Sequence, residues 1–182
     1  GHYKITAGTF GALVYDKNTG EALMLSNNHV LANVTDGSDG RAKKGDPIYQ
    51  PGPYDGGTEK DIIARLERFV PVYRDRKPAV CPVAGLVESI LNRVIKLFKP
   101  DYAVRMYKHD SRENTVDAAL AKPISDEAVK AEVLELGSIK GTAEARPGLR
   151  VAKSGRSSGV TRGLVQAVDV TLRVMMDEGE FA

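Results

Sequence analysis

The sequence has 182 residues, of which 42% are hydrophobic, and this is enough for one large globular domain or two small ones. Its 26 basic and 24 acidic residues nearly cancel, so the charge of the whole chain predicts neither nucleic acid nor a membrane as a partner. The single cysteine, Cys81, excludes an internal disulfide and a thiolate-based structural zinc site, and we expect it to be a small buried hydrophobe.

No apolar run reaches the length of a membrane span, and residues 1–6 do not have the layout of a signal peptide. We therefore expect a soluble protein, whose compartment these features leave unknown. No motif indicates a cofactor or a metal. Residues 36–40 have the composition of a calcium loop but neither its spacing nor its final glutamate, so we expect a turn there.

The N-terminal part of the chain has the pattern of antiparallel strands. Residues 9–15 and 21–25 are β-type runs on either side of an Asn/Gly turn, which predicts a hairpin with His29 just beyond its second strand. Residues 33–60 are rich in Gly, Asp and Pro and are expected to be loops around one short extended segment. Residues 61–72 alternate between apolar and polar side chains and predict a half-buried strand.

Residues 83–98 change to the helical period. Eight apolar side chains recur at helical spacing, and polar side chains occupy the other face. These eight are Val83, Leu86, Val87, Ile90, Leu91, Val94, Ile95 and Phe98. We expect one inserted amphipathic helix whose apolar stripe packs on the parent domain, with a membrane or partner surface as the alternative.

The C-terminal half is predicted to return to strands. Residues 103–107 are expected to form a strand, and Ser125 has the pattern of an N-cap for a short helix over residues 126–136. Residues 148–154 and 163–174 alternate and are rich in β-branched side chains, so we expect two more strands. The chain is therefore predicted to be mostly antiparallel β with two helices.

His29 and Asp117 are the two candidate catalytic residues. His29 follows a strand beside a polar turn, which suits a general base and equally suits a histidine that fills a core. Asp117 interrupts an apolar run, and a carboxylate there needs a partner. That partner is either an imidazole whose tautomer it fixes or, equally well, a turn or an arginine.

Three segments carry a family resemblance. Residues 25–31, Leu-Ser-Asn-Asn-His-Val-Leu, resemble the histidine motif of bacterial trypsin-like serine peptidases of the chymotrypsin fold. Residues 116–120, Val-Asp-Ala-Ala-Leu, resemble the aspartate motif of the same family. Residues 153–163, Lys-Ser-Gly-Arg-Ser-Ser-Gly-Val-Thr-Arg-Gly, are similar to a segment of the second barrel in several microbial members. The three occur in the family's order and extend over nearly the whole chain.

The resemblance implies an all-β fold of two antiparallel β-barrels of chymotrypsin type. Residues 1–123 would form the first barrel with the helical insertion, and residues 124–182 a linker helix and an incomplete second barrel. It also implies that His29 is the general base and Asp117 its orienting carboxylate. The family's nucleophile lies in a Gly-Asp-Ser-Gly motif, which this sequence does not contain.

The expectation is therefore the N-terminal part of a serine endopeptidase that lacks its nucleophile and is inactive alone. Its partners would be a peptide or protein substrate, and the C-terminal remainder of the protein or another copy would complete the second barrel. A non-catalytic peptidase-like binding module is the alternative. Residues 155–159 match Gly-x-Ser-x-Gly, but a strand is expected after them where a nucleophile elbow needs a helix, so we interpret Ser157 and Ser158 as turn serines.

Overall fold

The structure is a computed structural model that describes residues 1–4 and 6–171. The chain divides into two compact units, Gly1–Val129 and Lys130–Ala182, whereas we expected the division after Pro123. Strands make up most of the regular structure, as predicted, and helices are few. In the described part of the chain no sheet closes into a barrel.

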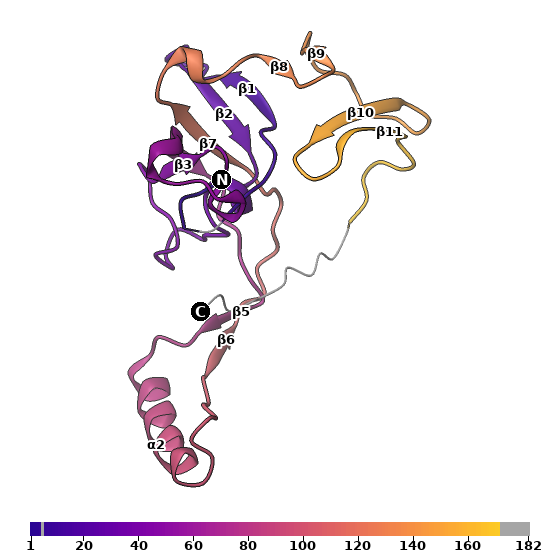
Figure 1. The fold of residues 1–182 in the computed structure, drawn as a ribbon. Helices are drawn as coiled ribbons and strands as arrows, with labels where there is room; N and C mark the ends of the chain where they lie inside the picture. The colour runs from indigo at the N-terminus through magenta and orange to yellow at the C-terminus, as the bar shows by residue number, and fades with distance from the viewer. Residues whose placement is uncertain (5, 172–182) are drawn as a thin grey trace. The chain divides into compact units, whose positions relative to one another are not determined.

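The first unit is built on one five-stranded antiparallel sheet (Figure 1). Its strands lie in the order β1 (Ala12–Tyr15), β2 (Ala22–Ser26), β7 (Ala119–Pro123), β4 (Ile62–Phe69) and β3 (Pro47–Tyr49). The predicted hairpin is confirmed as β1 and β2, and the predicted half-buried strand as β4. Three short 3-10 helices are η1 (Pro53–Asp55), η2 (Glu59–Asp61) and η3 (Asp126–Ala128).

The core of this unit lies between the sheet and α1 (Asn28–Leu31), a single helical turn directly after β2. Val30 and Leu31 of this turn belong to one hydrophobic cluster with buried side chains from alternate positions of β4 and β7. The core residues are Met24, Val30, Leu31, Ala32, Ala42, Ile48, Ala64, Leu66, Ala119 and Ala121. Because two of its four residues are anchored in the core, α1 has a fixed position at the end of β2.

The strand register brings the residues after β2 next to the residues before β7. Ser26, the last residue of β2, pairs with Ala119, the first residue of β7. Phe69 of β4 pairs with the same Ala119 from the other side. In antiparallel strands, the chain that leaves one strand and the chain that enters its neighbour lie at the same edge. His29 and Asp117 are a few residues beyond this edge.

A long insertion connects β4 to β7. It begins and ends with the two-stranded ribbon of β5 (Arg76–Pro78) and β6 (Tyr107–His109), and it carries α2 (Pro82–Phe98). The predicted helix is confirmed. The strand predicted over residues 103–107 is wrong except at Tyr107, because the preceding residues bind the side chains of α2 instead of a strand.

Two further expectations for the insertion are wrong. Cys81 is exposed, because it is the N-cap of α2, where its Sγ accepts a hydrogen bond from the Ala84 N–H at 3.3 Å. The apolar stripe of α2 is also exposed, with 78% of Phe98 open to solvent, whereas we expected it to pack on the parent domain. Among the described helices, none is both long enough and apolar enough to cross a membrane.

The second unit consists of two hairpins, described as far as Thr171. They are β8 (Glu132–Val133) with β9 (Gly137–Ser138), and β10 (Arg150–Gly155) with β11 (Gly159–Leu164). The strand predicted over residues 148–154 is confirmed as β10. The strand predicted over 163–174 is wrong from 165 to 171, and residues 172–174 lie outside the described part. The observed strand β11 begins earlier than predicted, at Gly159 directly after the turn, because it pairs with β10.

The helix predicted over residues 126–136 is wrong as well. Only Asp126–Ala128 form one 3-10 turn, and Val129 is extended with φ −139° and ψ 151°. The next residues turn back at Glu135 and Gly137, both with positive φ, and so form the β8–β9 hairpin. Ser125 precedes this 3-10 turn, but its side chain makes no capping hydrogen bond, and the chain continues into the β8–β9 hairpin instead of a helix.

Candidate active site

His29 and Asp117 are in direct contact. Nδ1 of the imidazole lies 2.5 Å from Oδ2 of the carboxylate. The backbone N–H of His29 donates a second hydrogen bond to Oδ1 of the same carboxylate, at 3.2 Å. Both carboxylate oxygens of Asp117 are thus held by one residue, so the ring and the backbone of His29 fix the orientation of the carboxyl group.

The contact determines which ring nitrogen is available for chemistry. An ionised carboxylate only accepts hydrogen bonds, so Nδ1 of His29 is the donor and Nε2 of the neutral ring keeps its lone pair. The His29 side chain is 46% exposed and that of Asp117 is 25% exposed. A substrate can therefore reach the ring, and this pair is suited to take up a proton at Nε2 while the carboxylate stabilises the resulting imidazolium.

Asn28 fixes the helical turn that carries His29. Its side chain is fully buried, and its Nδ2 donates to the carbonyl oxygens of Thr35, at 3.0 Å, and Val70, at 2.7 Å. Its Oδ1 accepts from the Thr35 N–H at 3.1 Å. One amide side chain therefore connects α1, the loop after α1 and the end of β4, directly beside the candidate base.

Asn27 supports the other member of the pair. Its Nδ2 donates to the backbone carbonyl of Asp117 at 3.0 Å, which holds the chain just before β7 against the end of β2. Sequence reasoning missed the roles of both asparagines. The available signal was the pair of amides immediately before the histidine, at a strand end where polar side chains need partners.

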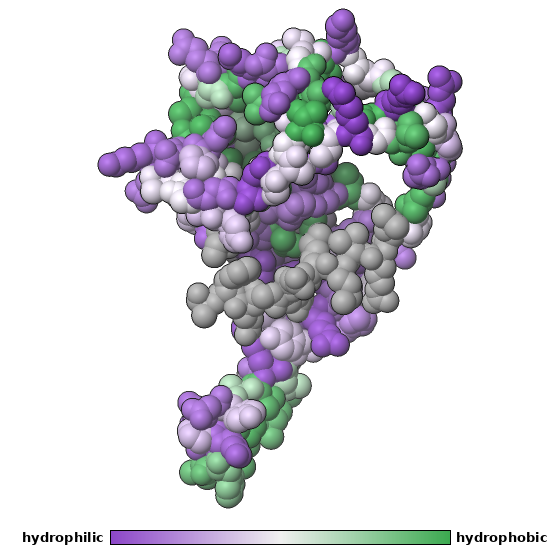
Figure 2. Space-filling model, turned by 45° about the vertical axis from the view of Figure 1, so that its right-hand side comes forward, coloured by the Kyte–Doolittle hydropathy of each residue, from purple (hydrophilic) through white to green (hydrophobic). Residues whose placement is uncertain are grey.

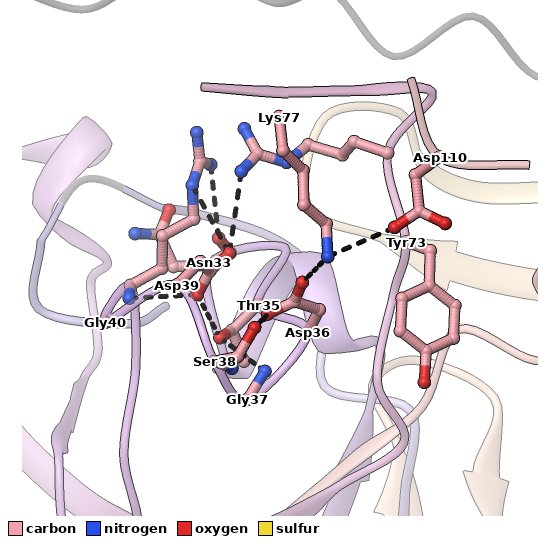
Figure 3. A network of polar contacts seen from close by, with 12 residues as sticks. Asn33, Thr35, Asp36, Gly37, Ser38, Asp39, Gly40, Tyr73, Lys77 and Asp110 are labelled. Atoms are coloured by element: carbon pink, nitrogen blue, oxygen red, sulfur yellow. Dashed lines mark hydrogen bonds and ion pairs between the residues drawn. The ribbon is translucent and has the colours of Figure 1, made fainter. Parts of the chain in front are cut away.

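A second polar network lies in the loop after α1 (Figure 3). Lys77 of β5 forms ion pairs with Asp36 of this loop and, at 3.2 Å, with Asp110 just after β6. Burial alone raises the pKa of Asp36, but hydrogen bonds from Lys77 and Ser38 outweigh it and lower the pKa to about 2. Hydrogen bonding to Asp36 also raises the pKa of Lys77. The base of the insertion is thereby tied to the loop that follows the candidate base.

Asp39 takes part in the same network through different partners. It accepts a hydrogen bond from the Thr35 hydroxyl at 2.6 Å, and Arg74 lies 3.5 Å from its Oδ2. Lysine and arginine side chains therefore neutralise the loop carboxylates of Asp36 and Asp39, as Figure 3 shows. Residues 36–40 form a bent turn, in agreement with the prediction. Within the described residues no group of three or more His, Cys, Asp or Glu side chains is arranged to hold a metal ion.

Ser157 and Ser158 lie in the turn between β10 and β11. The hydroxyl of Ser158 accepts a hydrogen bond from Lys153 Nζ at 2.5 Å, across the hairpin. A strand precedes this turn and another strand follows it, so the helix that a nucleophile elbow requires is not there. The turn interpretation of both serines is confirmed.

Comparisons with protein-family models, with curated proteins and with solved structures found no match to this chain. The functional conclusion therefore depends on the geometry of the site and on the sequence motifs.

Proposed function

We propose that this chain carries the general base and the orienting carboxylate of a trypsin-like serine endopeptidase. The observation that carries the proposal is the 2.5 Å contact between Nδ1 of His29 and Oδ2 of Asp117. A carboxylate at Nδ1 with an accessible Nε2 is the arrangement that serine peptidases need. The two barrels of chymotrypsin type that the resemblance implies belong to this proposal.

The proposed reaction is acyl transfer to a serine. Nε2 of His29 takes the proton of the serine hydroxyl as its oxygen attacks the peptide carbonyl, and Asp117 stabilises the imidazolium. The imidazolium then gives the proton to the leaving amine, and water cleaves the acyl-enzyme with His29 again as the base. We propose that the nucleophile lies outside these 182 residues, because the sequence contains no Gly-Asp-Ser-Gly motif and a strand, not the helix of a nucleophile elbow, follows Ser157 and Ser158.

Peptide hydrolysis by the intact protein tests the proposal. His29→Ala should lower kcat/KM by at least about 10⁴-fold, because the serine loses its base. His109→Ala is the matched control, since this histidine is exposed on β6 and should be dispensable. An intact protein that keeps its activity after His29→Ala rules out the assignment.

A fluorophosphonate probe gives an independent test, because it labels only an activated serine. The 182-residue chain alone should remain unlabelled, and the intact protein should be labelled in a manner that requires His29. Labelling of Ser157 or Ser158 in the isolated chain would contradict the proposed location of the nucleophile.

A second candidate function is a non-catalytic binding module. The observation that favours it is the exposed apolar face of α2, which has no role in peptide hydrolysis. Absence of fluorophosphonate labelling and of peptidase activity in the intact protein would select this candidate.

A further inference from the structure

An amphipathic helix of a globular domain ordinarily packs its apolar face on the protein, whereas α2 packs its polar face on the protein. Its polar face binds the returning chain: Asn92 exchanges two hydrogen bonds with the backbone of Val104, at 2.7 and 2.9 Å. Glu88 accepts from the Met106 N–H at 2.6 Å. Because the polar side chains hold the returning segment, the apolar face points away from it and is exposed to solvent.

The exposed apolar face is broad. In the helical projection its side chains cover an arc of about 140°, which is wider than the narrow a/d seam of a two-helix coiled coil. Its members are Val83, Leu86, Val87, Ile90, Leu91, Val94, Leu97 and Phe98, with 53% of Ile90 and 80% of Leu97 exposed. Figure 2 shows hydrophobic residues gathered over the segment that carries α2, beside hydrophilic ones.

The charge around this face is strongly asymmetric. Between residues 88 and 108 the chain has five basic and two acidic residues, a local charge of +3, although the whole chain carries only +2. The basic residues are Arg93, Lys96, Lys99, Arg105 and Lys108, and the acidic ones are Glu88 and Asp101. Glu88 is engaged with the Met106 N–H. Arg93 borders the apolar face, and the other basic residues lie on the polar face of α2 or in the chain that follows it. An exposed apolar face with this excess of positive charge beside it is complementary to an apolar phase with an anionic surface.

We propose that α2 binds the interface of an anionic phospholipid bilayer and inserts its apolar face among the acyl chains. Phe98 enters the boundary region and Arg93, which lies beside Leu86 at the edge of the apolar face, extends to the lipid phosphates. Lys96 on the polar face and Lys99 at the C-cap stay on the aqueous side, where their charges are attracted to the anionic surface. The near-neutral charge of the whole chain predicted no membrane partner, but the basic residues are concentrated next to α2. The inference concerns peripheral binding and is independent of the peptidase proposal.

Vesicle flotation of the purified 182-residue chain tests the charge requirement. The chain should bind vesicles of phosphatidylcholine mixed with phosphatidylglycerol more tightly than vesicles of phosphatidylcholine alone, and added salt should weaken the binding. Lys96→Gln and Lys99→Gln should each lower the partition coefficient about fivefold. Equal binding to both vesicle types, or no binding to either, overturns the proposal.

A matched pair of variants tests the apolar face. Ile90→Gln together with Val94→Gln should lower binding by at least about tenfold, because each removes a side chain that inserts into the bilayer. Ser89→Gln places the same amide on the polar side of the helix and should bind like the unmodified chain. If Ser89→Gln lowers vesicle binding as much as the double variant does, the apolar face does not insert into the bilayer.

The chain contains no tryptophan, so Phe98→Trp provides a single fluorescent reporter at the exposed end of α2. Its emission should shift to shorter wavelength when anionic vesicles are added, and brominated lipids should quench it. This measurement keeps the proposal testable if the double variant does not fold. A dimer in solution that Ile90→Gln abolishes, without any response to vesicles, would show that a second copy covers the face and would overturn the proposal.

Discussion

The side-chain Nδ2 of Asn28 donates a hydrogen bond to the backbone carbonyl of Val70, 2.7 Å away. This bond joins the helical turn of the candidate base to the end of β4, a strand that is not adjacent to it in the sequence. The same amide group binds the backbone of Thr35 on both its donor and its acceptor side. The position of His29 therefore depends on a buried side chain that takes no part in the proposed proton transfer.

Asn28→Ala should destabilise the first unit by about 1–3 kcal/mol, because a buried amide that bonds three backbone groups is lost and the Val70 carbonyl loses its Asn28 donor. The backbone groups of Thr35 keep their bonds to Ala32 and Val72. Urea unfolding followed by circular dichroism measures the change. Asn18→Ala, in the exposed turn between β1 and β2, is the control and should change the stability by less than about 0.5 kcal/mol. A loss below about 1 kcal/mol in Asn28→Ala would contradict the anchoring role.

Asp117→Asn should change the tautomer of His29. The carboxylate holds the proton on Nδ1, and a neutral amide holds it less strongly, so the ring should populate both tautomers. The ring ¹⁵N chemical shifts of histidine-labelled protein report this change directly. The resonances of His109 serve as the internal control, and a His29 spectrum that is identical in both proteins would contradict the contact.

Asp36 should contribute to acid stability. Its pKa is lowered from 3.8 to about 2, so its stabilising contribution is present above about pH 4 and is lost as the pH falls toward 2. Asp36→Asn should remove on the order of 1–2 kcal/mol at neutral pH and flatten the stability profile between pH 4 and 2.

A double-mutant cycle with Lys77→Met assigns this effect to the ion pair. If the pair with Lys77 is the cause, the two substitutions together should cost clearly less than the sum of the single losses. Strict additivity would attribute the effect to the hydrogen bonds from Ser38 instead.

Gly8→Ala should destabilise the first unit by about 1–3 kcal/mol. A Cβ at Gly8 would overlap the Cγ2 atom of Val30, which is buried and β-branched and so has little freedom to move. Gly85→Ala in α2 is the control, since a Cβ there meets no atom within 4 Å and alanine favours a helix. In thermal unfolding, Gly8→Ala should lower the Tm, and Gly85→Ala should raise it or leave it unchanged.

Local sequence patterns predicted the elements that local interactions control. The helical period over 83–98 predicted α2, and the alternation over 61–72 predicted β4, because each pattern recurs within one element. Prediction failed at residues 126–136, where the choice between helix and hairpin depends on the pairing of β8 with β9. It also failed at Cys81, whose exposure depends on its position before the first turn of α2.

The sequence by itself determined which residue types could form the candidate site, a histidine at a strand end and an aspartate in an apolar run. Only the tertiary structure decided that they meet, because the pairing of Ser26 with Ala119 is a long-range register that no local pattern specifies. The same distinction holds for α2. Periodicity determined which side chains share its apolar face, but the hydrogen bonds of Glu88 and Asn92 to the returning chain decided that this face is exposed.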